Sequence, residues 1–490
     1  MKTIKYMWMA CVAFAAVSLT ACSDDDGNSY PDGNAPVVVN AIYLEDADGT
    51  VKDRPVDFAR LGQTIRLEGS GFGGTRHVLV NGYDTYFNTT LVTDRNMVLQ
   101  LAATTPILSA DPEYRNKIVF VKDGGAEYSC DLIIRAAMPS ITVVDNTLPR
   151  PGELVIVRGT NLQEIVKVTL PGNVEVTTGI VSDEDGEWFS FRMPEGVTES
   201  GSIQADGANG TAFSPEYFNF NNCYIIDWDD LGLQGSWGQT YGSGDLVDDP
   251  LGTGRGKVVQ LIPQVEIDKG GIASGARTLL WATAGNDFED DDWSRMLKYI
   301  PGETPAKEVA IQFDVYVPGE WDKTGQFQIG LQNNLSTYGY GGANTKFSDQ
   351  YTNTAALWIP WLNEDGTTTP YTTGERWQTI SIPLSKFGNY NSDKYSIPDP
   401  KADDENYSSK LEEAIKNRAK ADAATFQKVI DDRNSGSYRN FVMVFCNSDL
   451  VFNDNLTLPA SATSQLIYID NIRIVPYKAP VVSDFPDEEE

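Results

Sequence analysis

The sequence predicts an all-β protein, in which two small β-sandwich repeats precede one larger two-sheet β-sandwich with a helical insertion. Three observations support this fold class. The segment Gly62–Gly82 recurs without a gap at Gly152–Gly172, an offset of 90 residues. From Phe220 onward, strands of alternating apolar residues follow one another between long loops. Only one long segment, Glu405–Asp432, has helical periodicity instead.

The first 22 residues predict a bacterial secretion signal. Lys2 and Lys5 precede the apolar run Met7–Leu19, which is too short to span a bilayer as a permanent helix. The run closes with Leu19–Cys22 (LTAC), which resembles the lipobox of bacterial lipoproteins. The resemblance implies a signal peptide at residues 1–21 and lipid attached to Cys22. The alternative is an ordinary secretory signal with a chance cysteine.

The residues that follow are acidic. Ser23–Asn28 (SDDDGN) resembles the export signal of Bacteroidetes surface lipoproteins. This resemblance implies that residues 22–35 form a flexible tether on the outer face of the outer membrane. The contact with the membrane would then be through the lipid anchor only.

Several function classes are disfavoured by composition. Cys11 lies inside the signal, and the spacing of Cys130, Cys223 and Cys446 matches no zinc motif, so we interpret these three as buried apolar residues. His77 is the only histidine, which argues against catalytic triads and histidine-rich metal sites. The formal net charge of −31 argues against a nucleic-acid partner, because a polyanion requires a basic surface.

The repeat predicts two copies of one small β-sandwich. Ile65 and Leu67 in the first copy, like their counterparts in the second, alternate as half-buried strand residues, and glycines mark the turns that follow. The aligned pairs are Gly62 with Gly152, Gly69 with Gly159, Phe72 with Leu162, Val78 with Val168, Val80 with Leu170 and Gly82 with Gly172.

Both copies resemble the immunoglobulin-like domains called IPT/TIG, through the shared pattern G-x-x-[IV]-x-[LV]-x-G-x-[GN]-[FL]. Prolines at positions 36, 139 and 215 punctuate the boundaries, which predicts immunoglobulin-like domain 1 at 36–137 and domain 2 at 138–219. Domains of this kind usually act as rigid spacers.

Residues 220–490 form the third predicted domain, a two-sheet jelly roll. In "VAIQFDVYV", the odd-numbered residues from Val309 to Val317 share one face. The helical insertion at about 405–432 is predicted to pack its apolar stripe on the sandwich; the stripe comprises Leu411, Ile415, Ala419, Phe426 and Ile430. The expected strands are Gly256–Ile262, Glu308–Val317, Gly325–Gln332, Ala355–Trp361, Trp377–Pro383, Asn440–Asn447 and Leu466–Pro476.

The phrases "FDVYVP", "WQTISIPLSKF" and "IYIDNIRIVP" resemble jelly-roll carbohydrate-binding modules. Together with the lipobox, the acidic signal and the two IPT-like repeats, they resemble the surface glycan-binding protein B family of Bacteroidetes polysaccharide utilisation loci. The resemblance implies a non-catalytic lipoprotein that captures a neutral plant β-glucan, with xyloglucan the first expectation. It also implies an outer-membrane transporter and companion surface glycan-binding lipoproteins as partners.

Two rival functions stay open. Laminarinase-like glycosidases carry E-x-D-x-x-E on a strand, which aims all three acids into one cleft. Glu266 and Asp268 begin such a motif, but Lys269–Ile272 supplies no second glutamate, so no catalytic residue is assigned. A β-sandwich glycoside hydrolase or lyase with other carboxylates is one rival. A surface adhesin that binds proteins through the repeats is the other.

No metal ligand or cofactor is assigned either. The acidic run Asn286–Asp292 offers clustered oxygen atoms of the kind that Ca²⁺ prefers, but it lacks the regular spacing of a calcium loop. Runs of like charge are usually solvated turns. A structural calcium ion stays an alternative.

Aromatic side chains carry the predicted binding. The flat C–H face of a glucose ring gains on the order of 1 kcal/mol when it stacks on an aromatic ring. Alternation predicts that Trp358 lies opposite the core residues Leu357 and Ile359, and Pro360 ends the strand so that Trp361 can swing beside it. The glycan-binding candidates are Trp281, Trp293, Trp321, Tyr338, Tyr340, Trp358, Trp361 and Tyr371, with Asn333, Asn334 and Asn363 as hydrogen-bonding candidates.

Overall fold

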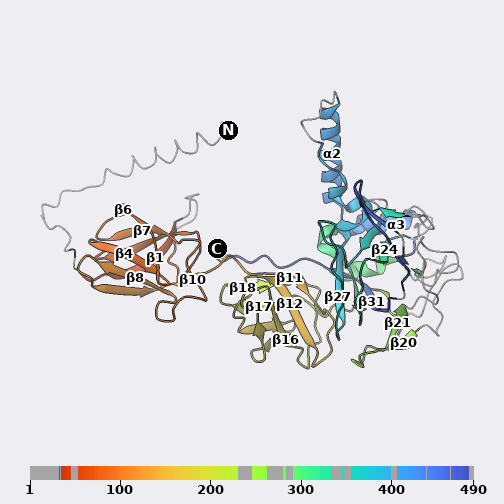
Figure 1. The fold of residues 1–490 in the computed structure, drawn as a ribbon, viewed down its shortest axis with the longest axis horizontal. Coiled ribbons are helices and arrows are strands. Elements are labelled where there is room, and N and C mark those ends of the chain that lie inside the picture. Colours follow the sequence, from red (N-terminus) through yellow and green to blue (C-terminus); the bar gives the residue numbers. More distant parts are fainter. Residues whose placement is uncertain are drawn as a thin grey trace. The chain divides into compact units, whose positions relative to one another are not determined.

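A computed structural model describes residues 33, 35–45, 53–229, 246–261, 280–282, 291–332, 344–346, 355–398, 406–436, 439–447, 449–463 and 465–484 (Figure 1). The chain divides into two compact units, Met1–Ala137 and Met138–Glu490. The second unit contains both the second repeat and the C-terminal domain. None of the helices in the described ranges is long and apolar enough to cross a membrane.

The first unit is an immunoglobulin-like sandwich of two four-stranded sheets, with one parallel pair beside them. Its first sheet has the order β1 (Val38–Glu45), β3 (Thr64–Ser70), β7 (Asn96–Gln100), β6 (Phe87–Val92). The second has the order β5 (Tyr83–Asp84), β4 (Thr75–Val80), β8 (Lys117–Lys122), β9 (Glu127–Asp131). The parallel pair is β10 (Ile133–Arg135) with β2 (Phe58–Arg60).

The second repeat has the same two-sheet plan. One sheet has the order β11 (Ser140–Val144), β12 (Leu154–Thr160), β16 (Trp188–Arg192), β15 (Val181–Ser182). The other has the order β14 (Val174–Val176), β13 (Lys167–Leu170), β17 (Gln204–Gly207), β18 (Gly210–Phe213). The prediction of two sandwich copies is confirmed.

The aligned glycines have the same role in both copies. Gly69 and Gly159 lie beside a register shift in the first strand pair of each sandwich. A Cβ atom at Gly69 would lie 1.9 Å from the carbonyl oxygen of Val38, and one at Gly159 would lie 1.8 Å from that of Ser140. Only glycine permits this close backbone approach. The same steric constraint therefore explains why glycine occurs at this position in both copies.

The C-terminal domain is a β-sandwich. Its first sheet has the order β20 (Leu246–Asp248), β21 (Lys257–Leu261), β31 (Ile467–Pro476), β23 (Val309–Tyr316), β27 (Gln378–Pro383), with β19 (Tyr224–Ile226) also paired to β31. The facing sheet has the order β22 (Leu280–Ala282), β28 (Val442–Cys446), β24 (Gln326–Gly330), β26 (Ala355–Trp358). A small third sheet has the order β25 (Asn344–Lys346), β29 (Asp449–Asn453), β30 (Leu456–Leu458). All seven expected strands are present, and β26 ends before Pro360 as predicted.

The helical insertion differs from the prediction. It forms two helices, α2 (Tyr407–Asp422) and α3 (Phe426–Ser435), because Thr425 starts the second helix by accepting a hydrogen bond from the Lys428 N–H. Only the α3 half packs as expected, through Phe426 and Ile430. Five short 3₁₀ helices complete the described helices: η2 (Trp293–Lys298), η3 (Ala306–Glu308), η6 (Leu384–Lys386), η7 (Gly388–Tyr390) and η8 (Ser392–Lys394).

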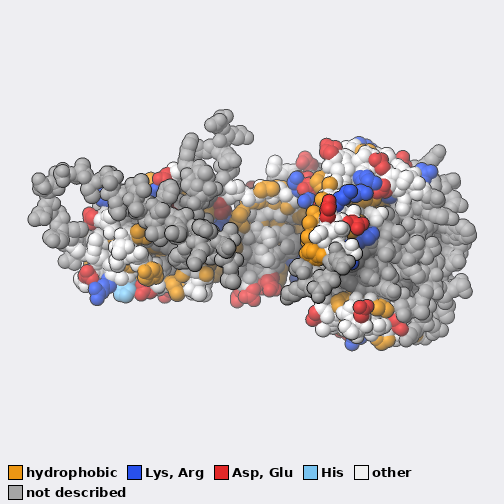
Figure 2. Space-filling model, turned by 90° about the horizontal axis from the view of Figure 1, so that it is seen from above, with side chains coloured by type: hydrophobic (Ala, Val, Ile, Leu, Met, Phe, Trp, Pro, Cys, Tyr) orange, Lys and Arg blue, Asp and Glu red, His pale blue; other side chains and the backbone are white. Residues whose placement is uncertain are grey.

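The predicted apolar stripe is wrong for α2. Ile415 is 53% exposed and Ala419 is also exposed, since the helix projects away from the sandwich (Figure 1). The sequence of α2 is mostly polar, and Figure 2 shows acidic and basic side chains interspersed over this side of the C-terminal unit. A stripe with so few apolar residues does not hold a helix against a sheet.

The free cysteines fit the sequence interpretation in part. Cys223 is buried, and burial raises the pKa of its thiol to about 12. Cys130 is half-buried, and burial followed by the charge of Asp131 raises the pKa of its thiol to about 12 as well. Thiols with such a raised pKa are poor nucleophiles at neutral pH.

Both faces of β23 are buried. Ile311, Phe313 and Val315 face the sandwich core, as alternation predicts. The opposite face carries Gln312 and Asp314, which are fully buried. Gln312 contacts Thr147 of the second repeat, and Asp314 pairs with Arg255. A polar strand face is therefore used as an interface between domains.

Hydrogen bonds cross this interface from Thr147 of the second repeat. Its hydroxyl lies 3.1 Å from the Gln312 side-chain oxygen and accepts a hydrogen bond from Arg473 at 2.7 Å. Its backbone N–H donates to the Thr379 hydroxyl at 3.0 Å. Three strands of the sandwich, β23, β27 and β31, thus hold one residue of the neighbouring domain.

Buried charges reinforce the junction. Arg255 donates to Asp314 at 2.8 Å and to Asn146 of the second repeat at 3.2 Å. Desolvation opposes ionisation of Asp314, but Arg473 and Arg255 outweigh it and hold the pKa of that carboxyl below its usual range. Asp470 beside it has the opposite shift, because burial and the charge of Asp314 raise its pKa well above the ordinary value.

Removal of the Asp314 charge is expected to weaken the whole second unit. Asp314→Asn leaves two buried guanidinium groups short of a counter-charge, which costs about 3 kcal/mol of unfolding free energy at pH 7. The folded pKa of Asp314 is depressed, so its contribution is present above the unfolded value of about 3.9 and is lost as the pH falls. In urea denaturation, the unfolding free energy of Asp314→Asn should therefore lie below that of wild type at pH 7, and this difference should narrow below pH 4.

The matched control is Asp123→Asn, which breaks an exposed ion pair with Arg76 and should cost less than about 0.5 kcal/mol. Equal stability of Asp314→Asn and wild type at pH 7 would contradict the role assigned to the junction.

Candidate functional site

A cluster of aromatic rings fills one end of the C-terminal sandwich. Trp358 of β26 pairs in register with Phe327 of β24, and their ring centroids are 5.5 Å apart. Trp358 also contacts Phe313 of the facing sheet at 5.2 Å and Trp321 at 5.6 Å, both edge to face. Tyr371 lies at 5.9 Å on a further side. Trp358 therefore points toward the core, between the two sheets.

This orientation corrects the prediction for Trp358. The register places Leu357 beside Gln328, on the face away from Phe327. Alternation along β26 is obeyed, but the core lies on the face of Trp358. The sequence of one strand does not reveal on which side the other sheet lies.

A tight turn before β24 depends on two indole N–H groups. Trp321 donates to the carbonyl oxygen of Thr324 at 2.5 Å, and Trp361 donates to that of Gly325 at 2.9 Å. Both rings are buried, with exposures of 0% and 1%. The expectation that Trp321 and Trp361 are exposed is wrong, because each ring satisfies its N–H on the turn that it covers.

Trp293 is also buried, contrary to the expectation. It lies in η2, its N–H donates to Asp291 at 3.0 Å, and the Arg433 guanidinium lies 3.7 Å from its ring centroid. Arg433 and Asp291 form a fully buried ion pair at 2.8 Å. The end of the acidic run thus anchors α3 to the sandwich.

Two of the predicted aromatic residues keep some exposure. Trp358 is half-buried, and no residue in the described ranges accepts a hydrogen bond from its indole N–H. Tyr371 is also half-buried; its hydroxyl donates to Gln378 at 2.9 Å, and burial raises its pKa. Among the aromatic candidates with described side chains, this pair is the one that a ligand can reach without unpacking the core.

The other face of the same sheet carries two glutamines that the sequence interpretation missed. Gln326 and Gln328 alternate with Phe327 along β24, and both are buried, with exposures of 0% and 3%. Leu357 is the register neighbour of Gln328. Amide side chains both donate and accept hydrogen bonds, but at these exposures the two glutamines serve the packing of the sheet and are not accessible to a ligand. The alternation in "QFQIG" is the signal that could have identified them.

Other candidates lie elsewhere. Asn363 is exposed, and its amide donates to Thr367 and Thr369 within its own turn. The backbone of Trp281 pairs with Met443 in β28, but its side chain lies outside the described residues. The remaining candidates are also outside them: Tyr338, Tyr340, Asn333, Asn334 and Cys22.

In the part of the chain that the structure describes, no three acidic, histidine or cysteine side chains converge on a point that could hold a metal ion. Asp291 uses its oxygens for Arg433, the Trp293 N–H and the Phe441 N–H. Residues 286–290 of the acidic run lie outside the described ranges.

Residues 218–476, more than half of the chain, match the family model described as the surface glycan-binding protein B xyloglucan binding domain. The chain belongs to the surface glycan-binding protein B family. The matched range begins at the end of the second repeat and contains both sheets of the sandwich and the aromatic cluster. Glycan binding is therefore the function of the C-terminal domain.

Similar proteins support the fold assignment. The crystal structure of the surface glycan-binding protein PbSGBP-B from Prevotella bryantii has a TM-score of 0.62 at 17% identity, with 91% of this chain and 99% of that one covered. An IPT/TIG domain-containing protein from Bacteroides ovatus is 28% identical over 200 residues. That alignment covers 40% of this chain and 37% of the relative, so the chain spans well under half of that protein's length.

The turn beneath the aromatic cluster yields a stability prediction. Gly325 has φ +76°, and an added Cβ would lie 2.1 Å from the Phe445 ring. Gly325→Ala should therefore cost about 1–2 kcal/mol for the left-handed backbone and about 1–3 kcal/mol more for the clash. The difference in stability between Gly325→Ala and Gly374→Ala, measured by thermal unfolding, gives the cost of the clash with Phe445.

Gly374 is the matched control, since its φ is +63° and nothing lies within 4 Å of an added Cβ. If the two variants lose the same stability, the turn is not packed against Phe445 as described.

Proposed function

We propose that the protein is a non-catalytic lipoprotein of the outer cell surface, which captures a plant β-glucan, above all xyloglucan, for an outer-membrane transporter. The lipid anchor is Cys22 and the tether is residues 22–35. Companion surface glycan-binding lipoproteins present the same polymer to the transporter. Adsorption requires no bond breaking, so no catalytic residue is needed.

The match of residues 218–476 to the xyloglucan-binding domain is the observation that carries this proposal. The half-buried Trp358 and Tyr371 supply the aromatic surface, with Trp281, Tyr338 and Tyr340 as further predicted contacts. Within the described ranges nothing accepts a hydrogen bond from the Trp358 indole N–H, which we assign to a sugar hydroxyl, while Phe313, Phe327 and Trp321 fix the ring. A rigid aromatic ring loses little entropy when it binds.

Weak individual contacts suit this role. Three stacked rings and a few hydrogen bonds, after the cost of ordering the ligand, give a dissociation constant of roughly 10 to 100 µM. A polymer that is bound by many copies on one surface is nevertheless retained, because the second contact becomes intramolecular. The negative charge of the chain does not oppose a neutral polymer.

Trp358→Phe tests the glycan contact with little change in packing. The variant loses the indole N–H and part of the ring face, so retardation in native gels that contain xyloglucan should fall by about fivefold in affinity, on the order of 1 kcal/mol. The melting temperature should fall less than in Trp361→Phe, because the Trp358 ring is half-buried and phenylalanine keeps part of its contacts with Phe313 and Phe327. Trp361→Phe is the matched control, since its N–H serves Gly325 and its ring is buried.

We expect Trp361→Phe to lower the melting temperature and leave gel retardation unchanged below that temperature. The opposite pattern, normal retardation of Trp358→Phe and lost retardation of Trp361→Phe, would contradict the assignment.

The two rivals predict different results in the same preparation. Released reducing sugar that disappears on replacement of a single carboxylate would indicate a glycoside hydrolase or lyase. Retention of all binding by residues 36–219 would indicate an adhesin that uses the repeats. Absence of retardation in xyloglucan, mixed-linkage β-glucan and starch would refute the proposal as a whole.

A further inference from the structure

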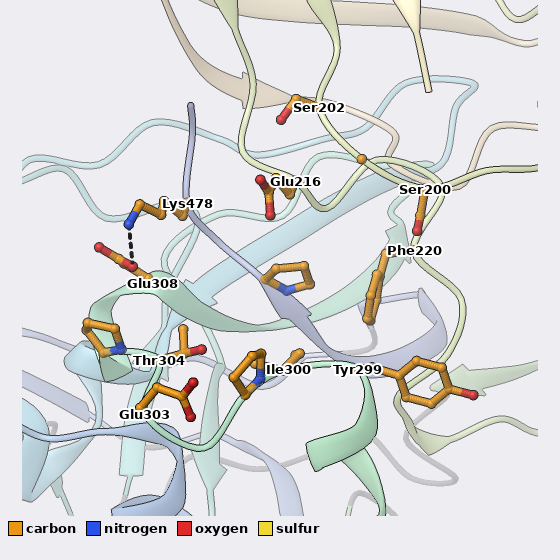
Figure 3. A pocket seen from close by; sticks show the side chains of 14 residues that line it. Ser200, Ser202, Glu216, Phe220, Tyr299, Ile300, Glu303, Thr304, Glu308 and Lys478 are labelled. Carbon is orange, nitrogen blue, oxygen red and sulfur yellow. Dashed lines mark ion pairs between the residues drawn. The ribbon is translucent and has the colours of Figure 1, made fainter. Parts of the chain in front are cut away.

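A second concave site lies at the junction of the second repeat and the C-terminal sandwich, away from Trp358. It is a pocket of about 620 Å³, within the range of about 300–1,000 Å³ that is typical of small-molecule sites. One wall comes from the second repeat, around Ser200 and Glu216 (Figure 3). The other comes from the segment between η2 and β23, around Tyr299 and Glu303.

Backbone hydrogen bonds fix these walls. The Glu216 N–H donates to the Lys478 carbonyl at 3.1 Å, which joins the second repeat to the segment that follows β31. Tyr477 N–H donates to the Glu308 carbonyl at 2.7 Å, and Phe426 N–H donates to that of Thr304 at 2.8 Å. Both walls belong to one compact unit, so the pocket is formed before any ligand arrives.

The charges in the pocket favour a ligand that carries no negative charge. Glu216, Glu303 and Glu308 line it together with a single ammonium group, that of Lys478. Lys478 is paired with Glu308 at 3.2 Å, while no ion pair joins Glu216 or Glu303 to any described residue. Two unneutralised carboxylates repel phosphates and uronic acids. The described carboxylates do not converge on a metal position either.

The aromatic ring and the carboxylates of the pocket fit a sugar. Tyr299 is 41% exposed at the pocket edge, and its ring stands nearly perpendicular to that of Phe220, with centroids 6.5 Å apart. The Lys298 ammonium lies 4.5 Å from the centroid of the Tyr299 ring, and the exposed part of that ring is apolar surface on which a sugar can pack. Carboxylates accept hydrogen bonds from hydroxyls more strongly than neutral acceptors do. Pyranose rings present both hydroxyls and a flat C–H face.

We propose that this junction pocket is a second sugar-binding site, which accepts a segment of a neutral oligosaccharide, with one pyranose unit against Tyr299 at the pocket edge and hydroxyls of neighbouring units donating hydrogen bonds to Glu303 and Glu216. The site extends the proposed glycan-binding function to a second position on the same rigid unit. One polymer chain held at two positions dissociates more slowly than at either alone.

Equilibrium dialysis with labelled cellotetraose, a neutral β-glucan fragment, tests the proposal by the moles bound per mole of protein at saturation. We expect two for wild type and one for Tyr299→Ala, while Trp358→Phe should still approach two, with one of its two sites about fivefold weaker. Glu303→Gln keeps the shape of the pocket and should weaken the Tyr299-dependent site by about tenfold or more. Digalacturonic acid, an anionic probe, should not bind there.

Tyr86→Ala is the matched control for loss of an exposed tyrosine, since Tyr86 is 84% exposed in the first unit. It should bind like wild type. Identical binding curves for wild type, Tyr299→Ala and Glu303→Gln would overturn the proposal, as would equal binding of digalacturonic acid.

The two variants test the two sites independently. Binding that is lost in Tyr299→Ala but unaffected by Trp358→Phe would support the junction site and refute the function assigned to Trp358. Binding that depends on Trp358 and not on Tyr299 would support the function assigned to Trp358 and refute the junction site.

Discussion

The fold of the C-terminal unit depends on the burial of the polar face of β23 against the second repeat. Without the second repeat, Gln312 and Arg473 would lose Thr147 as a hydrogen-bond partner and Arg255 would lose Asn146. In this protein Gln312, Asp314 and Arg473 are fully buried. Thr147 of the second repeat bonds to Gln312 and Arg473. Arg255 of the sandwich pairs with Asp314 and donates to Asn146 of the second repeat. Buried charges without partners are expensive, so the two domains are stable mainly together. The immunoglobulin-like repeat is therefore part of the binding unit.

The junction between the second repeat and the sandwich has a functional consequence. The aromatic cluster around Trp358 lies on the opposite side of β23, where Phe313 contacts it directly. One strand thus joins the domain junction to the proposed glycan-contact region. The junction pocket is built on the same fixed walls, through backbone bonds of residues 216, 308 and 478. Two rigid, neutral-ligand sites on one unit suit the capture of a long polymer better than one flexible site does.

Much of the fold could be predicted because its signals are local. Strand alternation fixed all seven expected strands, and the recurrence of Gly69 at Gly159 reflects one backbone clash that each repeat must avoid. The break between α2 and α3 was missed, although Thr425 is a good N-cap residue, because the apolar positions continue across it. Ile415 shows that such a stripe does not ensure packing.

The site was harder to predict, because it depends on which elements meet in space. Trp321 and Trp361 follow a turn and a proline, yet both are buried since their N–H groups bond to the turn before β24. Trp358 obeys alternation on the side that the sequence interpretation did not choose. The junction pocket joins residues near 200–220, 299–308 and 476–478, and no local pattern connects segments so far apart.

The central claim is that the C-terminal domain captures a neutral β-glucan without cleaving it. A crystal structure of the protein with a xyloglucan oligosaccharide tests this most directly. The account predicts an intact sugar chain with one pyranose ring against Trp358 and Tyr371, and the oligosaccharide unchanged in the mother liquor. Sugar found only on the first unit, or a cleaved oligosaccharide, would contradict it.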